Sequence, residues 1–187
     1  MVITNKGDSV HKILFDNSGS MSELGKEQLL INALRFSRQY IELNNVTEFV
    51  SYHQIGEKID EIKIENNKDI VILPPGGRCS GKVISEWILP QENTPILWLT
   101  DGYNSFSEEE IFNLSKKANI TVVALGCDAG IEQLERFSSP IFMTHNLDAA
   151  LTLFFFPPNE CSFLPKTVTA LDIVEELATD ESDADEW

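Results

Sequence analysis

Short apolar runs separated by polar turns predict the strands of this protein. Three runs have wholly apolar centres, as expected for strands buried on both faces of a sheet: residues 12–16, 96–100 and 120–125. Weaker runs at 46–55 and 58–64 flank Gly56-Glu57 and predict a hairpin whose second strand lies at a sheet edge. Residues 140–143 predict a last strand, and residues 69–73 predict a short strand or the approach to a loop.

Segments with helical periodicity separate these strands. Residues 22–43 place an apolar stripe on one face of a helix: Leu30, Ala33, Leu34, Ser37 and Ile41. The same segment leaves four charged side chains to solvent: Lys26, Glu27, Arg35 and Arg38. Shorter helices are predicted at 83–89, after a Ser107–Glu110 capping box, at 131–137, and from an Asn146 cap to Phe155.

The alternation of strands and helices predicts the fold class. We expect an α/β fold of the Rossmann-like type: a doubly wound, mostly parallel sheet with one antiparallel edge strand and helices on both faces. Residues 1–156 are expected to form this domain and residues 157–187 a C-terminal extension. Ligands of such sheets bind at the carboxyl ends of the strands, which here are residues 16–20, 101–102 and 126–128.

Composition is that of a globular protein and disfavours two classes of partner. Apolar residues make up 42% of the 187 residues and charged residues 24%. With 14 basic and 30 acidic residues the net charge is −16, a poor match to nucleic acid or to an anionic membrane. We therefore expect neither as a partner.

The sequence favours a cytoplasmic location. Its first residues lack an apolar run of signal-peptide length, and no run of about 18 apolar residues would span a bilayer. Three cysteines, Cys79, Cys127 and Cys161, are too scattered for a disulfide framework or a zinc cluster. We expect them to be reduced thiols.

Two strand ends carry the residues with the most informative chemistry. Asp16, Ser18 and Ser20 follow the first strand at alternate positions, and Gly19 allows a tight turn between the hydroxyls. Asp101 supplies a second carboxylate from the end of another central strand. Such hard oxygen donors suit Mg²⁺ or Mn²⁺. We expect them at the rim of the sheet, where substitution would remove the metal and leave the fold.

At these residues the sequence resembles the von Willebrand factor A (vWA) family, whose metal-ion-dependent adhesion site (MIDAS) begins with a D-x-S-x-S turn. Asp16-x-Ser18-x-Ser20 matches that turn, Thr100-Asp101-Gly102 matches its third loop, and the order of elements matches from residue 12 to about 156. The resemblance implies a protein-binding module whose metal is completed by an acidic residue of another protein. These residues do not pair a nucleophile with a base that would activate it, so we expect a non-enzyme. Intracellular members often serve AAA+ ATPases or multi-protein complexes.

The second loop departs from the family pattern. The family usually has threonine directly after a Gly-Gly pair, whereas Gly76-Gly77 is followed here by Arg78. A slightly longer loop would let Ser80 act as the ligand. Otherwise water fills the position, or Arg78 meets the partner's acidic residue directly.

An enzymatic alternative uses the same carboxylates. The segment from Gly76 to Lys82 nearly spells a phosphate-binding loop, but Val83 stands where a Ser or Thr would hold Mg²⁺. A metal-dependent phosphohydrolase or nucleotide-binding enzyme would use this loop with Asp16 and Asp101. Serine at position 18 removes the general acid of the aspartyl phosphatase pattern.

Residues 157–187 combine an amphipathic segment with an acidic tail. One predicted helical face carries Ala170, Leu171, Val174, Leu177 and Ala178. Eight acidic residues and no basic ones lie between Asp172 and Trp187. The extension is either a helix packed on the domain with a solvated tail, or an element that docks a partner through Trp187.

Overall fold

The computed structural model describes residues 11–46, 50–64, 70, 72, 74–77, 80–91, 94–117 and 119–158. In these residues six strands form one sheet: β1 (His11–Asp16), β2 (Val50–Ile55), β3 (Ile59–Ile62), β4 (Ile96–Thr100), β5 (Ile120–Ala124) and β6 (Ile141–Met143). Their order is β3-β2-β1-β4-β5-β6. Neighbouring strands are parallel except for β2 and β3, which are antiparallel. The predicted fold class and the hairpin are confirmed.

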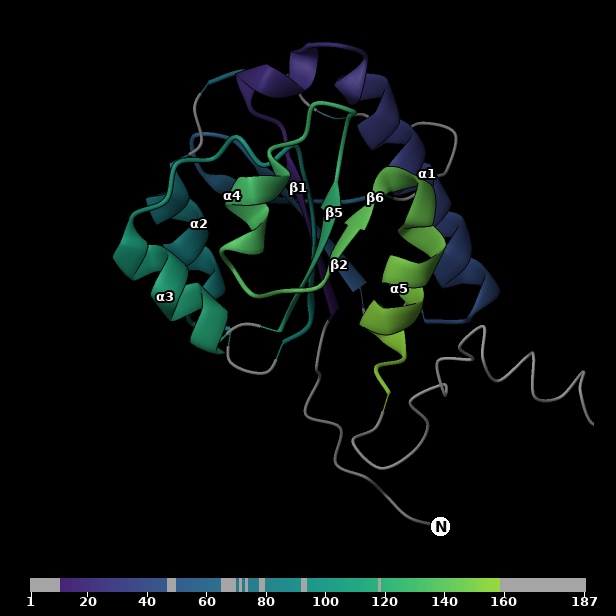
Figure 1. Ribbon diagram of the computed structural model, residues 1–187. Coiled ribbons are helices and arrows are strands. Elements are labelled where there is room, and N and C mark those ends of the chain that lie inside the picture. Colours follow the sequence, from purple (N-terminus) through teal and green to yellow (C-terminus); the bar gives the residue numbers. More distant parts are fainter. Residues whose placement is uncertain are drawn as a thin grey trace, which may run out of the picture. The chain divides into compact units, whose positions relative to one another are not determined.

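Helices cover both faces of this sheet (Figure 1). They are α1 (Lys26–Leu43), α2 (Gly81–Ile88), α3 (Glu108–Lys117), α4 (Ile131–Glu135) and α5 (Leu147–Phe155), with 3-10 turns at Gly19–Ser22 and Thr144–Asn146. α1 and α5 lie on one face, and α2, α3 and α4 lie on the other (Figure 1). No helix in the described ranges is long and apolar enough to cross a membrane.

The central strands are buried on both faces, which explains their unbroken apolar runs. Successive side chains of a strand point to opposite faces. Ile13 and Phe15 of β1 therefore join the core under α1 and α5, while Leu14 joins the core under α2, α3 and α4. Trp98 of β4 is fully buried in that second core, between Phe106 and Phe137.

Several element boundaries differ from the sequence prediction. The helix predicted from residue 22 begins at Lys26, because Leu24 and Gly25 have φ angles of 52° and 75° and break the helical path. Asn146 precedes α5 as predicted, but its side chain makes no capping hydrogen bond. Ile70 and Ile72 are not in a strand, and the rest of the segment 69–73 lies outside the described residues.

Other local predictions are confirmed. The stripe predicted for the first long helix is buried as Leu30, Ala33, Leu34, Ser37 and Ile41. The capping box at α3 is present, with Ser107 N donating to Glu110 Oε2 at 2.7 Å and Glu110 N donating to Ser107 Oγ at 3.3 Å. Lys26, however, is buried and not exposed to solvent.

His53 makes the stability of this fold depend on pH. Burial, helped by the charge of Lys12, lowers the pKa of His53 to about 4. In the unfolded chain the pKa of a histidine is about 6.5, so between these two pKa values the unfolded state binds more protons. Stability should therefore fall as pH decreases through this window, and His53→Gln should remove that contribution.

We expect wild type to lose about 2 kcal/mol more of its unfolding free energy than His53→Gln between pH 7 and pH 4.5. Urea denaturation of both proteins at the two pH values measures the difference. Equal losses in the two proteins would show that folding does not lower the pKa of His53.

Candidate metal site

The predicted ligands lie where the chain leaves neighbouring strands toward opposite faces of the sheet. β1 leads to α1 on one face, and β4 leads to α3 on the other (Figure 1). Phe15 pairs with Leu99, so Asp16 and Thr100 end the two strands side by side. This is the crevice at which open α/β sheets bind ligands.

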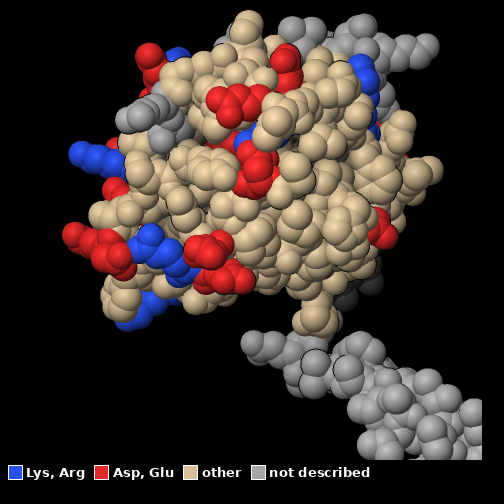
Figure 2. All heavy atoms as spheres, turned by 45° about the horizontal axis from the view of Figure 1, so that its top comes forward, with Lys and Arg blue, Asp and Glu red and all other residues tan. Residues whose placement is uncertain are grey.

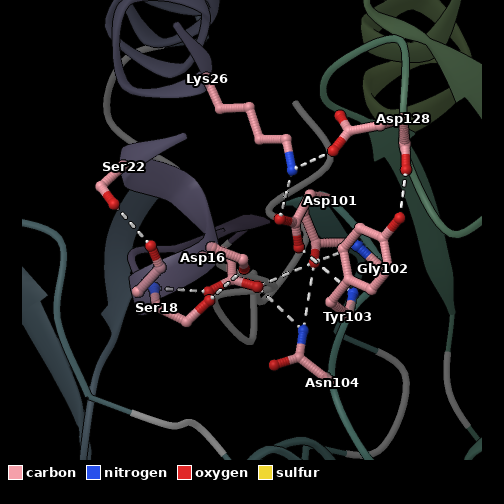
Figure 3. Close-up of polar contacts among 12 residues, drawn as sticks. Asp16, Ser18, Ser22, Lys26, Asp101, Gly102, Tyr103, Asn104 and Asp128 are labelled. Atoms are coloured by element: carbon pink, nitrogen blue, oxygen red, sulfur yellow. Dashed lines mark hydrogen bonds and ion pairs between the residues drawn. The ribbon is translucent and has the colours of Figure 1, made fainter. Parts of the chain in front are cut away.

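Asp16 is the buried centre of the site. Its side chain is 0% exposed. One oxygen, Oδ1, accepts a hydrogen bond from Ser18 N at 2.8 Å. The other, Oδ2, accepts from Thr100 Oγ1 at 3.0 Å and from Asn104 Nδ2 at 2.9 Å (Figure 3). Asp101 is also 0% exposed, so both carboxylates are buried at this rim of the sheet.

Two serine hydroxyls lie next to this carboxylate. Ser18 Oγ and Ser20 Oγ are 3.1 Å apart and line a cleft of about 580 Å³. Two neighbouring ligands of an octahedral Mg²⁺, each 2.0–2.1 Å from the ion, are separated by about 3 Å. The hydroxyl pair therefore has the spacing that such a cation needs.

The second carboxylate, Asp101, is held by two donors from the protein. Tyr103 N donates to Oδ1 at 3.2 Å, and Lys26 Nζ donates to Oδ2 at 3.0 Å (Figure 3). Lys26 also pairs with Asp128 at 2.8 Å and is 1% exposed. Burial alone would lower the pKa of Lys26, but its hydrogen bonds to Asp128 and Asp101 outweigh burial and raise it. Lys26 is therefore an ammonium ion inside the site.

Solved structures share this architecture. Proximal thread matrix protein 1 of the mussel byssus, with a zinc-occupied MIDAS motif, has 17% identity, a TM-score of 0.52, and coverage of 78% of this chain and 46% of its own. Manganese-loaded TRAP protein of Plasmodium vivax has 12% identity and a TM-score of 0.55. The match covers 79% of this chain and 73% of the TRAP chain. An aerotolerance-related membrane protein of Bacteroides fragilis has 11% identity, a TM-score of 0.50, and coverage of 77% and 95%.

These proteins contain vWA domains. This chain has the vWA fold. The shared region spans less than half of the mussel protein, and at such low identity the likeness shows the fold alone. No protein-family model and no curated protein matches the sequence.

The predicted second loop brings Ser80 to the cleft. Ser80 precedes α2 as its N-cap and lines the same cleft as Ser18 and Ser20. Its hydroxyl accepts a long hydrogen bond from Val83 N, 3.4 Å away. Arg78, the other candidate for this position, lies outside the described residues, as does Trp187.

Gly76 and Gly77 of this loop form backbone hydrogen bonds with the serine turn. Gly19 N donates to Gly77 O at 3.1 Å, and Gly76 N donates to Asn17 O at 3.1 Å. At the start of α2, Gly81 N donates to Ser105 O at 2.9 Å. The Lys82 side chain is 74% exposed and lies 3.8 Å from Glu86 Oε1. Among the described residues of this loop, the amides of Gly76 and Gly81 are therefore engaged by backbone carbonyls and are not free to bind a phosphate group.

The donor set fits a hard divalent cation. Ser18, Ser20 and Ser80 offer hydroxyl oxygens, and Asp16 and Asp101 offer carboxylates beside them. No group of three His, Cys, Asp or Glu side chains that could hold a metal occurs in the described part of the chain. A metal here would therefore depend on the serine hydroxyls.

Sequence reasoning missed three polar members of the site. Asn104 donates to Asp16, and Lys26 and Asp128 pair beside Asp101. Asp128 follows the third buried strand, so its position at a strand end was the only available signal. Asn104 lies in a loop without periodicity, and Lys26 was assigned to the exposed face of a helix.

Ser18→Ala tests the hydroxyl pair without changing any charge. The variant should bind Mn²⁺ at least about tenfold more weakly, because one oxygen ligand is lost. Its unfolding free energy should change by about 1 kcal/mol or less, since the Ser18 hydroxyl makes its hydrogen bond to the neighbouring, part-exposed Ser20 hydroxyl. Isothermal titration calorimetry with Mn²⁺ and urea denaturation measure the two quantities.

Ser22→Ala is the matched control on the same turn. Ser22 is exposed, and its hydroxyl donates to Gly19 O at 2.7 Å instead of facing Ser18. Its Mn²⁺ affinity should equal that of wild type. Equal affinities for Ser18→Ala and Ser22→Ala would contradict the assignment of Ser18 as a ligand.

Proposed function

We propose that this chain is a metal-dependent protein-binding module that acts as an adaptor. Ser18, Ser20 and Ser80 hold Mg²⁺ or Mn²⁺ together with Asp16 and Asp101, and an Asp or Glu of the partner protein completes the coordination. The observation that carries this proposal is the pair of hydroxyls, 3.1 Å apart, in an open cleft beside buried carboxylates.

Each group has a distinct role in this proposal. Asp16 supplies negative charge and fixes the turn that presents both hydroxyls. The hydroxyls are neutral, so they hold the cation without cancelling its charge. The bound cation supplies electrostatic attraction for a carboxylate that enters from solvent.

The surface around the cleft suits a protein partner. Tyr103 lines the cleft and is 52% exposed, which offers an aromatic contact of the kind enriched in interfaces. Figure 2 looks toward this end of the molecule and shows acidic side chains near the middle of a largely uncharged surface. This face supports a protein partner more than a nucleic acid, which is bound by clustered basic side chains.

The groups around the cleft favour binding over catalysis. Nucleophilic catalysis by a serine needs a base within hydrogen-bond reach. The described residues that line the cleft are serines, glycines, Asn104 and Tyr103, and Ser18 Oγ bonds Ser20 Oγ. The positions of Gly81 and Lys82 likewise give no support to the phosphohydrolase or nucleotide-binding alternative.

We place the protein in the cytoplasm as part of the same proposal. Cys127 carries a free and exposed thiol, which persists in a reducing compartment. An AAA+ ATPase or a multi-protein complex as partner remains a prediction from the family resemblance.

Affinity capture on the full chain tests the proposal. Immobilised wild-type protein is exposed to an extract of its own cells in Mg²⁺ or in EDTA, beside the Ser18→Ala and Ser22→Ala variants. We expect a partner that wild type and Ser22→Ala retain in Mg²⁺, and that EDTA or Ser18→Ala reduces at least tenfold. Partners captured equally in all four conditions would contradict a metal-dependent function.

A further inference from the structure

A lysine ammonium group is buried at the predicted metal site. Lys26 Nζ lies 3.0 Å from Asp101 Oδ2 and 2.8 Å from Asp128 Oδ2, and the side chain is 1% exposed. Lysine is almost never fully buried unless it is paired. Asp101 is the more buried of its two partners, and it is one of the two carboxylates that would face the cation.

The surrounding backbone is shaped to hold this lysine. Leu24 and Gly25 adopt left-handed conformations that turn the chain into α1, so that Lys26 starts the helix pointing inward. Gly126, with φ of 97°, leaves room for the side chain, because a Cβ there would lie 3.1 Å from Lys26 Cε. Tyr103 covers the ammonium with its ring centroid 5.2 Å from Nζ.

Tyr103 is itself fixed in this position. Its hydroxyl donates to Asp128 O at 2.6 Å, which spans the ends of β4 and β5 (Figure 3). Lys26 is thus enclosed by Asp101, Asp128, Gly126 and Tyr103. Buried ion pairs are often no more stabilising than apolar side chains of similar volume, so stability alone does not account for this arrangement.

We infer that Lys26 sets the charge of the metal site and keeps the bound cation receptive to an outside carboxylate. This inference rests on the proposed function. Asp16 and Asp101 together carry two negative charges, which would neutralise a divalent cation. The Lys26 ammonium, hydrogen-bonded to Asp101, adds one positive charge and leaves that set of four at a net charge of one positive. Asp128 is 31% exposed and offsets part of this positive charge from the solvent side.

The inference predicts two opposite effects for Lys26→Gln, which keeps a hydrogen-bond donor but removes the charge. Affinity for Mn²⁺ alone should rise at least about tenfold, because a repulsive charge beside Asp101 is gone. Affinity of the Mn²⁺-loaded protein for acetate should fall at least about threefold, because the net positive charge that attracts the anion is reduced by one. A purely structural role of Lys26 would weaken Mn²⁺ binding instead.

Two measurements on the full chain give these affinities. Calorimetry gives Mn²⁺ affinity, and water-proton relaxation of the Mn²⁺-loaded protein reports acetate as it displaces water from the ion. Lys116→Gln is the matched control, since it removes the same charge from an exposed residue near the end of α3. Its two affinities should equal those of wild type.

The outcomes separate this inference from the proposed function. If wild type binds Mn²⁺ and acetate but Lys26→Gln binds Mn²⁺ no more tightly, the charge role of Lys26 is overturned and the proposed function stands. If neither protein binds Mn²⁺, both are overturned. If only Lys26→Gln binds Mn²⁺, the charge role holds and the proposed function fails.

A second variant covers the case in which Lys26→Gln does not fold. Asp128→Asn keeps Lys26 and Asp101 and changes only the more exposed partner of the ammonium. The positive charge at the site would then be less compensated, so Mn²⁺ affinity should fall about threefold or more. Unchanged Mn²⁺ affinity in Asp128→Asn would overturn the inference.

Discussion

The burial of the Asp16 carboxylate is the constraint on which the site depends. A buried anion is costly unless hydrogen bonds replace its water. Three segments supply those bonds: the turn after β1 through Ser18 N, the end of β4 through Thr100, and the following loop through Asn104. Because all three must converge on one carboxylate, the serine turn has a fixed position relative to β4.

The sheet makes this convergence possible. β1 and β4 are parallel neighbours that lie in the middle of the strand order, and both are covered by helices on each face. Their carboxyl ends therefore meet at a point held by two apolar cores. Loops can then present polar groups in the crevice, since the strands beneath them are rigid. The second loop holds the serine turn through two further hydrogen bonds. Gly19 N donates to Gly77 O, and Gly76 N donates to Asn17 O.

Apolar periodicity was sufficient to predict the elements, because both faces of the central strands and one face of each long helix are buried. The residues of β4 were predicted without error, and the predicted helix was right from Lys26 to Leu43. The spacing of Asp16, Ser18 and Ser20 pointed to the candidate site, because residues within one short turn are brought together without tertiary information. Ser80 was an alternative in sequence and lines the cleft in the structure, whereas Arg78 lies outside the described residues.

Periodicity failed where backbone geometry changed the start of a helix. Leu24 and Gly25 take left-handed conformations, which shift the start of α1 and turn Lys26 from the expected solvent face into the site. A local sequence pattern cannot predict that Lys26, the first residue of a helix, pairs with Asp101 and Asp128, which lie 75 and 102 positions later. The same contact changes the charge of the site, so the chemistry could not be completed from the motif alone.

The central claim is that the two serine hydroxyls hold a divalent cation at the ends of β1 and β4. The most direct measurement is the anomalous difference map of crystals of the full chain grown with Mn²⁺. The account predicts one peak about 2 Å from both Ser18 Oγ and Ser20 Oγ, with Lys26 still paired to Asp101. A map with no peak there at saturating Mn²⁺, or with a peak that does not contact these hydroxyls, would contradict it.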